Sequence, residues 1–170
     1  GTNPTSLTTH LTHPFSINVV GNIHLINLFL PLILQGHAKK VIAISSGFGD
    51  IDLVRNYSLA LNASYAINKA ALNMAVAQFS AEFGERRGVL FLSVSPGFVE
   101  TGQYDCLSEE ENKAVLALAG KFSQYSPDFK GPISPEESVK AVLKVVEESS
   151  VEKGDGGAFY SHLGKGQKWL

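Results

Sequence analysis

Apolar and polar positions form blocks along the chain that predict helices and strands in turn. Seven segments follow this pattern, four of helical length and three short apolar runs: about 15–34, 40–45, 64–84, 89–95, 108–122, 135–149 and 157–161. Helices that alternate with short buried strands are typical of parallel sheets joined by right-handed crossovers. We therefore expect an α/β fold, a doubly wound parallel sheet with flanking helices, with residues 1–170 forming a single domain.

Two of the predicted helices have clear terminal signals. Gly88 ends the helix over 64–84, because glycine readily takes the left-handed conformation that closes a helix. Ser134, Pro135 and Glu137 form a helix start, with serine as N-cap, proline at the first helical position and glutamate as capping-box partner. These signals are structural, and we assign them no chemistry.

The helices over 15–34 and 64–84 are apolar on nearly all sides. The first is interrupted by polar side chains, among them Asn22 and His24, so burial in protein is favoured over a membrane span. A helix of this kind must be covered on more than one side, and the sheet can cover only one. We therefore expect a homo-oligomer, a homodimer paired through these two helices.

Composition is ordinary for a soluble intracellular domain, with 44% hydrophobic and 18% charged residues. A net charge of −2 and a pI near 6.2 predict no general attraction to nucleic acid or to an anionic membrane. One cysteine, Cys106, excludes an intrachain disulfide and a multi-cysteine metal site. The five histidines lack metal-ligand spacing, so we expect surface or capping histidines and no metal.

The first residues of the chain, Gly-Thr-Asn-Pro-Thr-Ser, contain neither a basic region nor an apolar run. We read no secretory signal in them and expect a cytoplasmic protein. The start also lacks an initiator Met, which suggests a processed, cloned or partial chain.

Tyr65 and Lys69 are four residues apart in the predicted helix over 64–84. Residues at positions i and i+4 share a helix face, so the ammonium can lie near the phenol. A tyrosine with its ordinary pKa of about 10 is a poor acid or base at neutral pH, and a neighbouring cation favours its ionised form. The pair indicates a proton-transfer site, although the spacing also fits a half-buried tyrosine beside a solvated lysine.

Three further motifs accompany the pair in a fixed order: Phe-Ser-Ile-Asn-Val-Val-Gly at 15–21, Val-Ile-Ala-Ile-Ser-Ser-Gly at 41–47 and Val-Ser-Pro-Gly-Phe-Val-Glu-Thr at 94–101. With them, the sequence from about Phe15 to the end resembles the short-chain dehydrogenase/reductase family. The family's glycine-rich nucleotide loop and its Asn-Asn-Ala-Gly segment have no counterpart here. We therefore expect the C-terminal part of such an enzyme and a partial Rossmann-like sheet.

The resemblance implies hydride transfer between a nicotinamide cofactor and the carbon of a small alcohol or carbonyl substrate. Tyr65 is expected to act as general acid or base on the substrate oxygen, while Lys69 stabilises the phenolate and holds the nicotinamide ribose. Ser46 is expected to bind the substrate oxygen. Asn18 is expected to support a water-linked proton relay behind the lysine.

The choice between Ser45 and Ser46 is open, because the two serines adjoin and the stretch from Gly47 to Ala63 is longer than most family members carry. We prefer Ser46, since the family's catalytic serine is usually the second of such a pair. Mutation of each serine distinguishes them.

The nicotinamide end is expected to meet the Pro-Gly segment, where the resemblance assigns contacts to Pro96, Gly97, Val99 and Thr101. The choice between NAD and NADP is open, because the residue that decides it lies in the nucleotide half. The resemblance also implies a substrate lid at about 102–131. Without the nucleotide half, we expect the 170-residue chain alone to bind no dinucleotide tightly and to have little turnover.

Two other functions fit parts of the pattern. One is a non-catalytic protein that keeps the dimer-forming helices of this fold. The other is a sugar-nucleotide epimerase or dehydratase, since those relatives share the Tyr/Lys pair. The Pro-Gly segment and the short chain after it favour the dehydrogenase/reductase.

Overall fold

The structure is a computed structural model that describes residues 3–102 and 107–170. It contains all seven predicted segments, with shifted ends. It also contains three helical segments that the sequence pattern did not predict, over residues 4–15, 47–49 and 51–56. In chain order the elements are α1 (Pro4–Phe15), the π-helical segment η1 (Ser16–Val20), α2 (Gly21–Gln35), β1 (Lys40–Ile44), the 3-10 turn η2 (Gly47–Gly49), α3 (Ile51–Asn56), α4 (Ala63–Arg87), β2 (Leu90–Ser95), α5 (Glu109–Tyr125), α6 (Pro135–Glu148) and β3 (Phe159–Ser161). Cys106 lies outside the described residues.

The three strands form one parallel sheet in the order β1-β2-β3. Ile44 is paired with Val94, and Ser95 is paired with Ser161, so the carboxyl ends of all three strands lie at the same edge. Within the described residues β1 pairs only with β2 and forms one edge of the sheet. The α/β class with parallel strands is confirmed.

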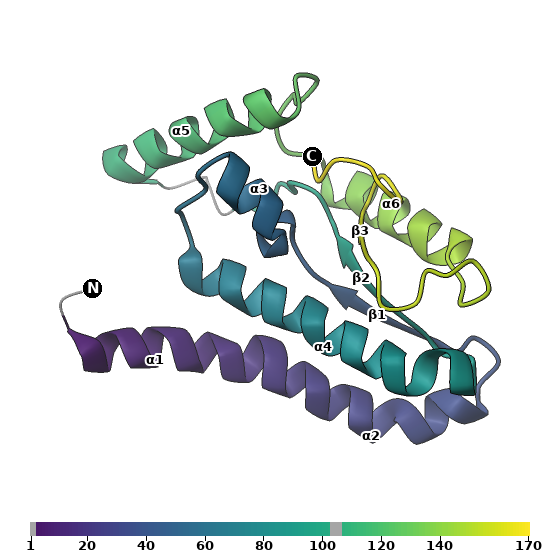
Figure 1. Cartoon of the computed structure of the whole chain (residues 1–170). Coiled ribbons are helices and arrows are strands. Elements are labelled where there is room, and N and C mark those ends of the chain that lie inside the picture. Colours follow the sequence, from purple (N-terminus) through teal and green to yellow (C-terminus); the bar gives the residue numbers. More distant parts are fainter. Residues whose placement is uncertain (1–2, 103–106) are drawn as a thin grey trace.

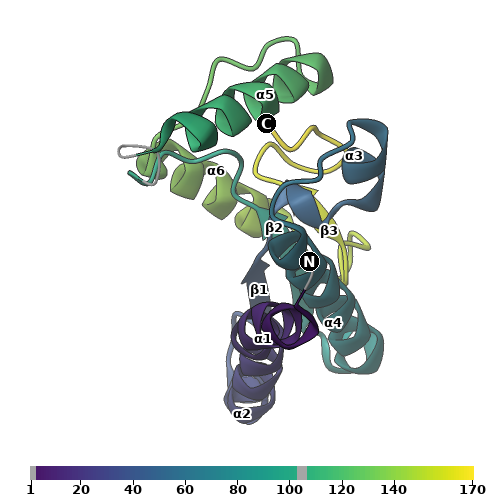
Figure 2. The ribbon, with the colours of Figure 1, turned by 90° about the vertical axis from the view of Figure 1, so that its left-hand side faces the viewer.

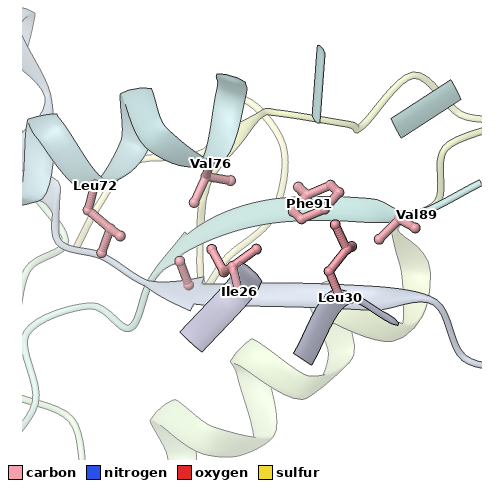
Figure 3. Close-up of a cluster of buried hydrophobic side chains, with 7 residues drawn as sticks. Ile26, Leu30, Leu72, Val76, Val89 and Phe91 are labelled. Carbon is pink, nitrogen blue, oxygen red and sulfur yellow. The ribbon is translucent and has the colours of Figure 1, made fainter. Parts of the chain in front are cut away.

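Helices cover both faces of the sheet (Figures 1 and 2). On one face α2 and α4 pack against the strands, and Figure 3 shows Leu72 and Val76 of α4 and Ile26 of α2 pointing toward the sheet, in the same core as Phe91. On the other face of the sheet, Val145 of α6 packs against the side chains of β2 and β3 that point toward that face. The side chains of β2 are buried along its whole length, as expected for a strand covered on both sides.

The first helix is longer than predicted, because α1, η1 and α2 run as one continuous rod from Pro4 to Gln35. By length and composition this rod could cross a membrane, and the core helix of a soluble protein can have the same length and composition. In the most apolar stretch of 18 residues, 17% is buried. Its inner face is buried as predicted, at Ile26 and Leu30. Its outer face is open in the single chain, where Leu28 is 73% exposed.

The helix ends confirm the predicted signals. Gly88 closes α4 in the left-handed conformation, with φ at 65°. Ser134 caps α6, and its side chain and that of Glu137 form the predicted capping box. A second capping box joins Ser108 and Glu111 at the start of α5.

Replacing Leu72 with alanine should lower the free energy of unfolding by about 2–5 kcal/mol, because it leaves a cavity between α4 and the sheet. Leu72 is 2% exposed, whereas Leu116 on α5 is 73% exposed. The matched variant Leu116→Ala should change the free energy by less than about 0.5 kcal/mol. Urea denaturation followed by circular dichroism measures both. Equal losses for the two variants would contradict the core described for α4.

Candidate active site

A cavity of about 560 Å³ lies at the carboxyl edge of the sheet. Its lining includes residues 46–48 after β1, residues 95–99 at the end of β2, and Tyr65 in the first turn of α4. This is the edge at which open parallel sheets bind ligands. The structure therefore brings the two predicted strand ends and the predicted tyrosine to one site.

The two adjacent serines occupy different environments. Ser45 is 1% exposed, its backbone N–H donates to the Val94 carbonyl, and its hydroxyl has no hydrogen-bond partner within the described residues. Ser46 lines the cavity, where its hydroxyl accepts from the Phe48 N–H at 3.3 Å. Only Ser46 of the two therefore presents its side chain to the cavity lining.

A hydrogen bond between the two strand ends fixes the place of Ser46. The Gly47 N–H donates to the Ser95 hydroxyl at 3.0 Å, and both groups are buried. Because Gly47 follows Ser46 directly, this bond anchors the turn that carries the serine. The pattern of apolar positions contains no signal for this contact.

Tyr65 and Lys69 share a face of α4, as their spacing predicted. The Lys69 Nζ lies 5.5 Å from the centroid of the Tyr65 ring. Tyr65 is 41% exposed, and the Phe48 ring packs edge-on to it at 6.3 Å. The phenol is therefore held by an aromatic neighbour and a cation while part of it is open to the cavity.

Lys69 is tied to the end of β1. Its Nζ donates to the Ile44 carbonyl at 2.8 Å, and burial lowers the pKa of its ammonium. An ammonium has three N–H donors, so this bond leaves two for other partners. A fixed ammonium with donors to spare fits the hydroxyls of a ribose.

Asn18 lies outside the cavity lining, in the π-helical segment that packs against α4. Its side-chain amide donates to the Pro14 carbonyl at 3.0 Å, one turn back along the helix. Segments of π-helix widen the helix locally and are frequent at functional sites. The structure thus places Asn18 behind the helix that carries Tyr65, with no described contact to Lys69.

The Pro-Gly segment turns where β2 ends. Gly97 has φ at 84°, and a Cβ on it would lie 2.6 Å from the His162 ring, so both conformation and space require glycine. The Ser138 hydroxyl donates to the Pro96 carbonyl at 2.7 Å and holds the turn from the start of α6. Thr101 lines the same cavity and is exposed.

His162 corrects the expectation that the histidines are surface or capping residues. It is 6% exposed, packs beneath Gly97, and burial lowers the pKa of its imidazole. Its backbone N–H donates to the Ser95 carbonyl at 2.8 Å. This histidine supports the turn of the Pro-Gly segment, a role that its sequence neighbours did not indicate.

The predicted lid region, residues 102–131, begins and ends beside the cavity. An isolated parallel bridge joins Val99 to Ile133, at the two ends of the excursion that contains residues 102–131. Within it, Leu118 and Phe122 of α5 line the cavity. The described part of the excursion therefore contributes one wall of the site, next to the Pro-Gly segment.

The last residues of the chain form a wall of the cavity that the sequence motifs did not predict. Trp169 and Leu170 line the cavity. The Trp169 indole N–H donates to the Asp50 carboxylate at 2.7 Å, and its backbone N–H donates to the Tyr125 hydroxyl at 3.0 Å. Since Asp50 and Trp169 are far apart in the sequence and neither belongs to a motif, only the fold reveals this contact.

The site suits an organic cofactor better than a metal. Within the described residues no group of three or more His, Cys, Asp or Glu side chains could hold a metal ion. The Pro-Gly turn instead offers backbone without a Cβ at Gly97, and the Lys69 ammonium stands at the adjoining strand end. These groups fit the nicotinamide and ribose end of a dinucleotide.

Two kinds of sequence comparison agree on the relatives of this chain. A family model described as short chain dehydrogenase matches residues 5–112. The short chain dehydrogenase virK from Hypocrea virens is 47% identical over 170 residues, which cover 100% of this chain and 62% of virK. The short-chain dehydrogenase/reductase iacC from Pestalotiopsis fici is 48% identical over 156 residues, which cover 92% of this chain and 57% of iacC.

Solved structures share the fold. The NADPH-bound carbonyl reductase from chicken fatty liver matches with a TM-score of 0.69 and 24% identity, over 95% of this chain and 57% of that chain. The carbonyl reductase Sniffer of D. melanogaster matches with a TM-score of 0.64 and 19% identity, over 95% of this chain and 58% of that chain. At these identities the likeness concerns the fold alone.

The chain spans 62% and 57% of the length of the two curated relatives named above. The family model covers more than half of the chain, and its match extends from α1 through β2 into α5, so it includes both strand ends and the Tyr65 helix. By this match, the chain belongs to the short-chain dehydrogenase family.

Proposed function

We propose that the protein is an NAD(P)-dependent oxidoreductase that interconverts an alcohol and a carbonyl compound, with Tyr65 as general acid/base. The observation that carries the proposal is the meeting of Ser46 and Tyr65 in one cavity, with the Lys69 ammonium 5.5 Å from the tyrosine ring. The family membership and the names of the relatives, which include dehydrogenases and reductases, support it.

When bound, the nicotinamide supplies or accepts the hydride at the substrate carbon. In reduction Tyr65 gives its phenolic proton to the carbonyl oxygen, and in oxidation its phenolate takes the proton of the hydroxyl. Ser46 donates a hydrogen bond to the same oxygen and fixes its position. Lys69 stabilises the phenolate and binds the ribose.

Asn18 is proposed to support the proton relay that returns a proton to Tyr65 through Lys69 and water. Its place in the π-helical segment against α4 is consistent with a site behind the lysine. Pro96, Gly97, Val99 and Thr101 are proposed to contact the nicotinamide end of NAD or NADP. All four line the cavity beside Tyr65.

We propose that the 170-residue chain alone has little turnover, because the described residues supply the nicotinamide end of the site and not the cradle of the pyrophosphate. The activity tests therefore use the full-length protein that contains these residues.

Replacing Tyr65 with phenylalanine should lower kcat by roughly 10²–10⁴-fold, because the ring remains while the transferable proton is lost. The matched control is Tyr57→Phe, since Tyr57 packs edge-on to Tyr125 and does not line the cavity. Steady-state oxidation of NADH or NADPH measures both variants, and the control should keep the wild-type kcat. Full turnover by Tyr65→Phe would refute the mechanism.

Replacing Ser46 with alanine should lower kcat by about 10²-fold, because a hydrogen bond to the reacting oxygen is lost. The Ser45→Ala variant should stay near the wild-type rate, since Ser45 is buried and is not among the described residues that line this cavity. The same assay compares the two variants. The reverse order of effects would assign the role to Ser45.

We propose a homodimer through α2 and α4. Both helices carry exposed apolar side chains, including Leu28 at 73%, Leu32 at 63% and Met74 at 62%. Exposed apolar surface of this kind is common at interfaces between protein chains.

The variant Leu28→Asp should convert the dimer to a monomer, because the new carboxylate would be buried in the interface without a partner. The matched control is Leu116→Asp on α5, where the leucine is also 73% exposed. Sedimentation equilibrium at micromolar concentration gives the mass of each. A monomeric mass for the unmodified protein would contradict the proposal.

A further inference from the structure

Hydroxyl-bearing and aromatic side chains line the cavity together. Ser46 and Tyr65 supply the hydroxyls of the proposed reaction, and the rings of Phe48, Phe98, Phe122 and Trp169 belong to the same lining. The described lining residues include no Asp, Glu, Lys or Arg. A site of this composition favours an uncharged, largely apolar ligand.

Several of these rings meet edge to face and together form an aromatic wall of the cavity. Phe48 and Phe122 lie 6.3 Å apart with planes at 64°, and Phe98 and Phe122 lie 5.7 Å apart at 68°. Aromatic rings prefer such edge-on or offset contacts, and a flat ligand ring can join the set in the same geometry. A puckered aliphatic ring of equal size gains only the burial of its surface.

Three contacts hold Trp169 in this aromatic wall. Its ring stacks on Phe159 with centroids 4.2 Å apart and planes at 16°. The indole N–H donates to Asp50, and the backbone N–H donates to the Tyr125 hydroxyl. One face, the polar edge and the backbone are therefore all occupied, which fixes the orientation of the indole at the cavity.

The indole also touches the turn that carries Ser46. A Cβ on Gly47 would lie 2.7 Å from the Trp169 Cβ and 2.9 Å from its Cγ, so the close approach requires glycine there. The position of Trp169 is thereby linked to the residue beside Ser46. A substrate whose oxygen binds Ser46 therefore lies in the cavity whose wall Trp169 helps to form.

We propose that Trp169 is a specificity-determining residue and that the substrate is an uncharged carbonyl compound, or its alcohol, whose reacting carbon is attached to a planar aromatic ring system. The proposal rests on the proposed function. Asp50 and Tyr125 act through Trp169 as positioning residues. The Asp50 carboxylate also caps α3 through its other oxygen, which binds the N–H groups of Asp52 and Leu53.

The test compares two ketones with the same carbon skeleton, 2-acetylnaphthalene and its saturated analogue 2-acetyldecalin, on the full-length protein with NADH and with NADPH. The measured quantity is the ratio of their kcat/KM values. We expect the flat ketone to be preferred by about tenfold, the range that specific ring contacts supply. The Trp169→Ala variant should lower this ratio by about the same factor, and Trp169→Phe should keep a part of the preference.

Two further variants separate pocket effects from folding effects. Asp50→Asn can still cap α3 but cannot accept from the indole N–H at the same time, so the preference should fall while the ring is retained. This variant decides the question if Trp169→Ala does not fold. Leu163→Ala is the matched control on the same terminal segment, because Leu163 is 53% exposed and does not line the cavity; it should keep the wild-type ratio.

A binding measurement makes the outcome independent of turnover. Trp169 is the only tryptophan of the sequence, and subtracting the emission of Trp169→Phe isolates its fluorescence. Titration with 2-acetylnaphthalene should quench this emission, and 2-acetyldecalin should quench it less at equal concentration.

The outcomes distinguish the two proposals. A ratio that Trp169→Ala leaves unchanged would overturn the role of Trp169 and leave the proposed reaction intact. Absence of turnover for every carbonyl and alcohol would overturn the reaction. In that case selective quenching by the flat ketone would still support the ligand class, and equal quenching would refute it.

Discussion

The parallel register of β1 and β2 is the constraint on which the site depends. It aligns Ile44 with Val94, so the residues that follow each strand emerge side by side. The bond from the Gly47 N–H to the Ser95 hydroxyl then joins the two turns across the strand ends. A shift of one residue would turn Ser46 away from the cavity and Ser45 toward it, because neighbouring residues of a strand face opposite sides.

Elements with strong local signals were predictable from the sequence, and elements held by distant contacts were not. The helix over 135–148 carries its own cap, and β2 is an apolar run interrupted only by Ser93 and ended by Ser95. The segment of η2 and α3 is too short to show a helical period, although Leu53 is buried and Val54 packs against the same core. Its order comes from contacts such as that of Asp50 with Trp169, which are 119 positions apart.

The predicted start of the first helix, at about residue 15, was late for a physical reason. The segment α1 is rich in threonine, which has a weak helix propensity, so the pattern indicates no helix there. In the structure the hydroxyls of Thr8, Thr9 and Thr12 donate to carbonyls one turn back, and Asn3 caps the first turn. The Ser64 hydroxyl also donates to the His10 carbonyl, which ties α1 to the start of α4.

The bridge between Val99 and Ile133 has a consequence for how this chain can diversify. It closes the excursion at its base, where backbone hydrogen bonds join Ile133 to Phe98 and Glu100. Closing a longer loop costs little more than closing a shorter one, since the entropy grows only with the logarithm of length. The length of this segment can therefore vary at little energetic cost while the two bridge residues stay paired beside the end of the sheet.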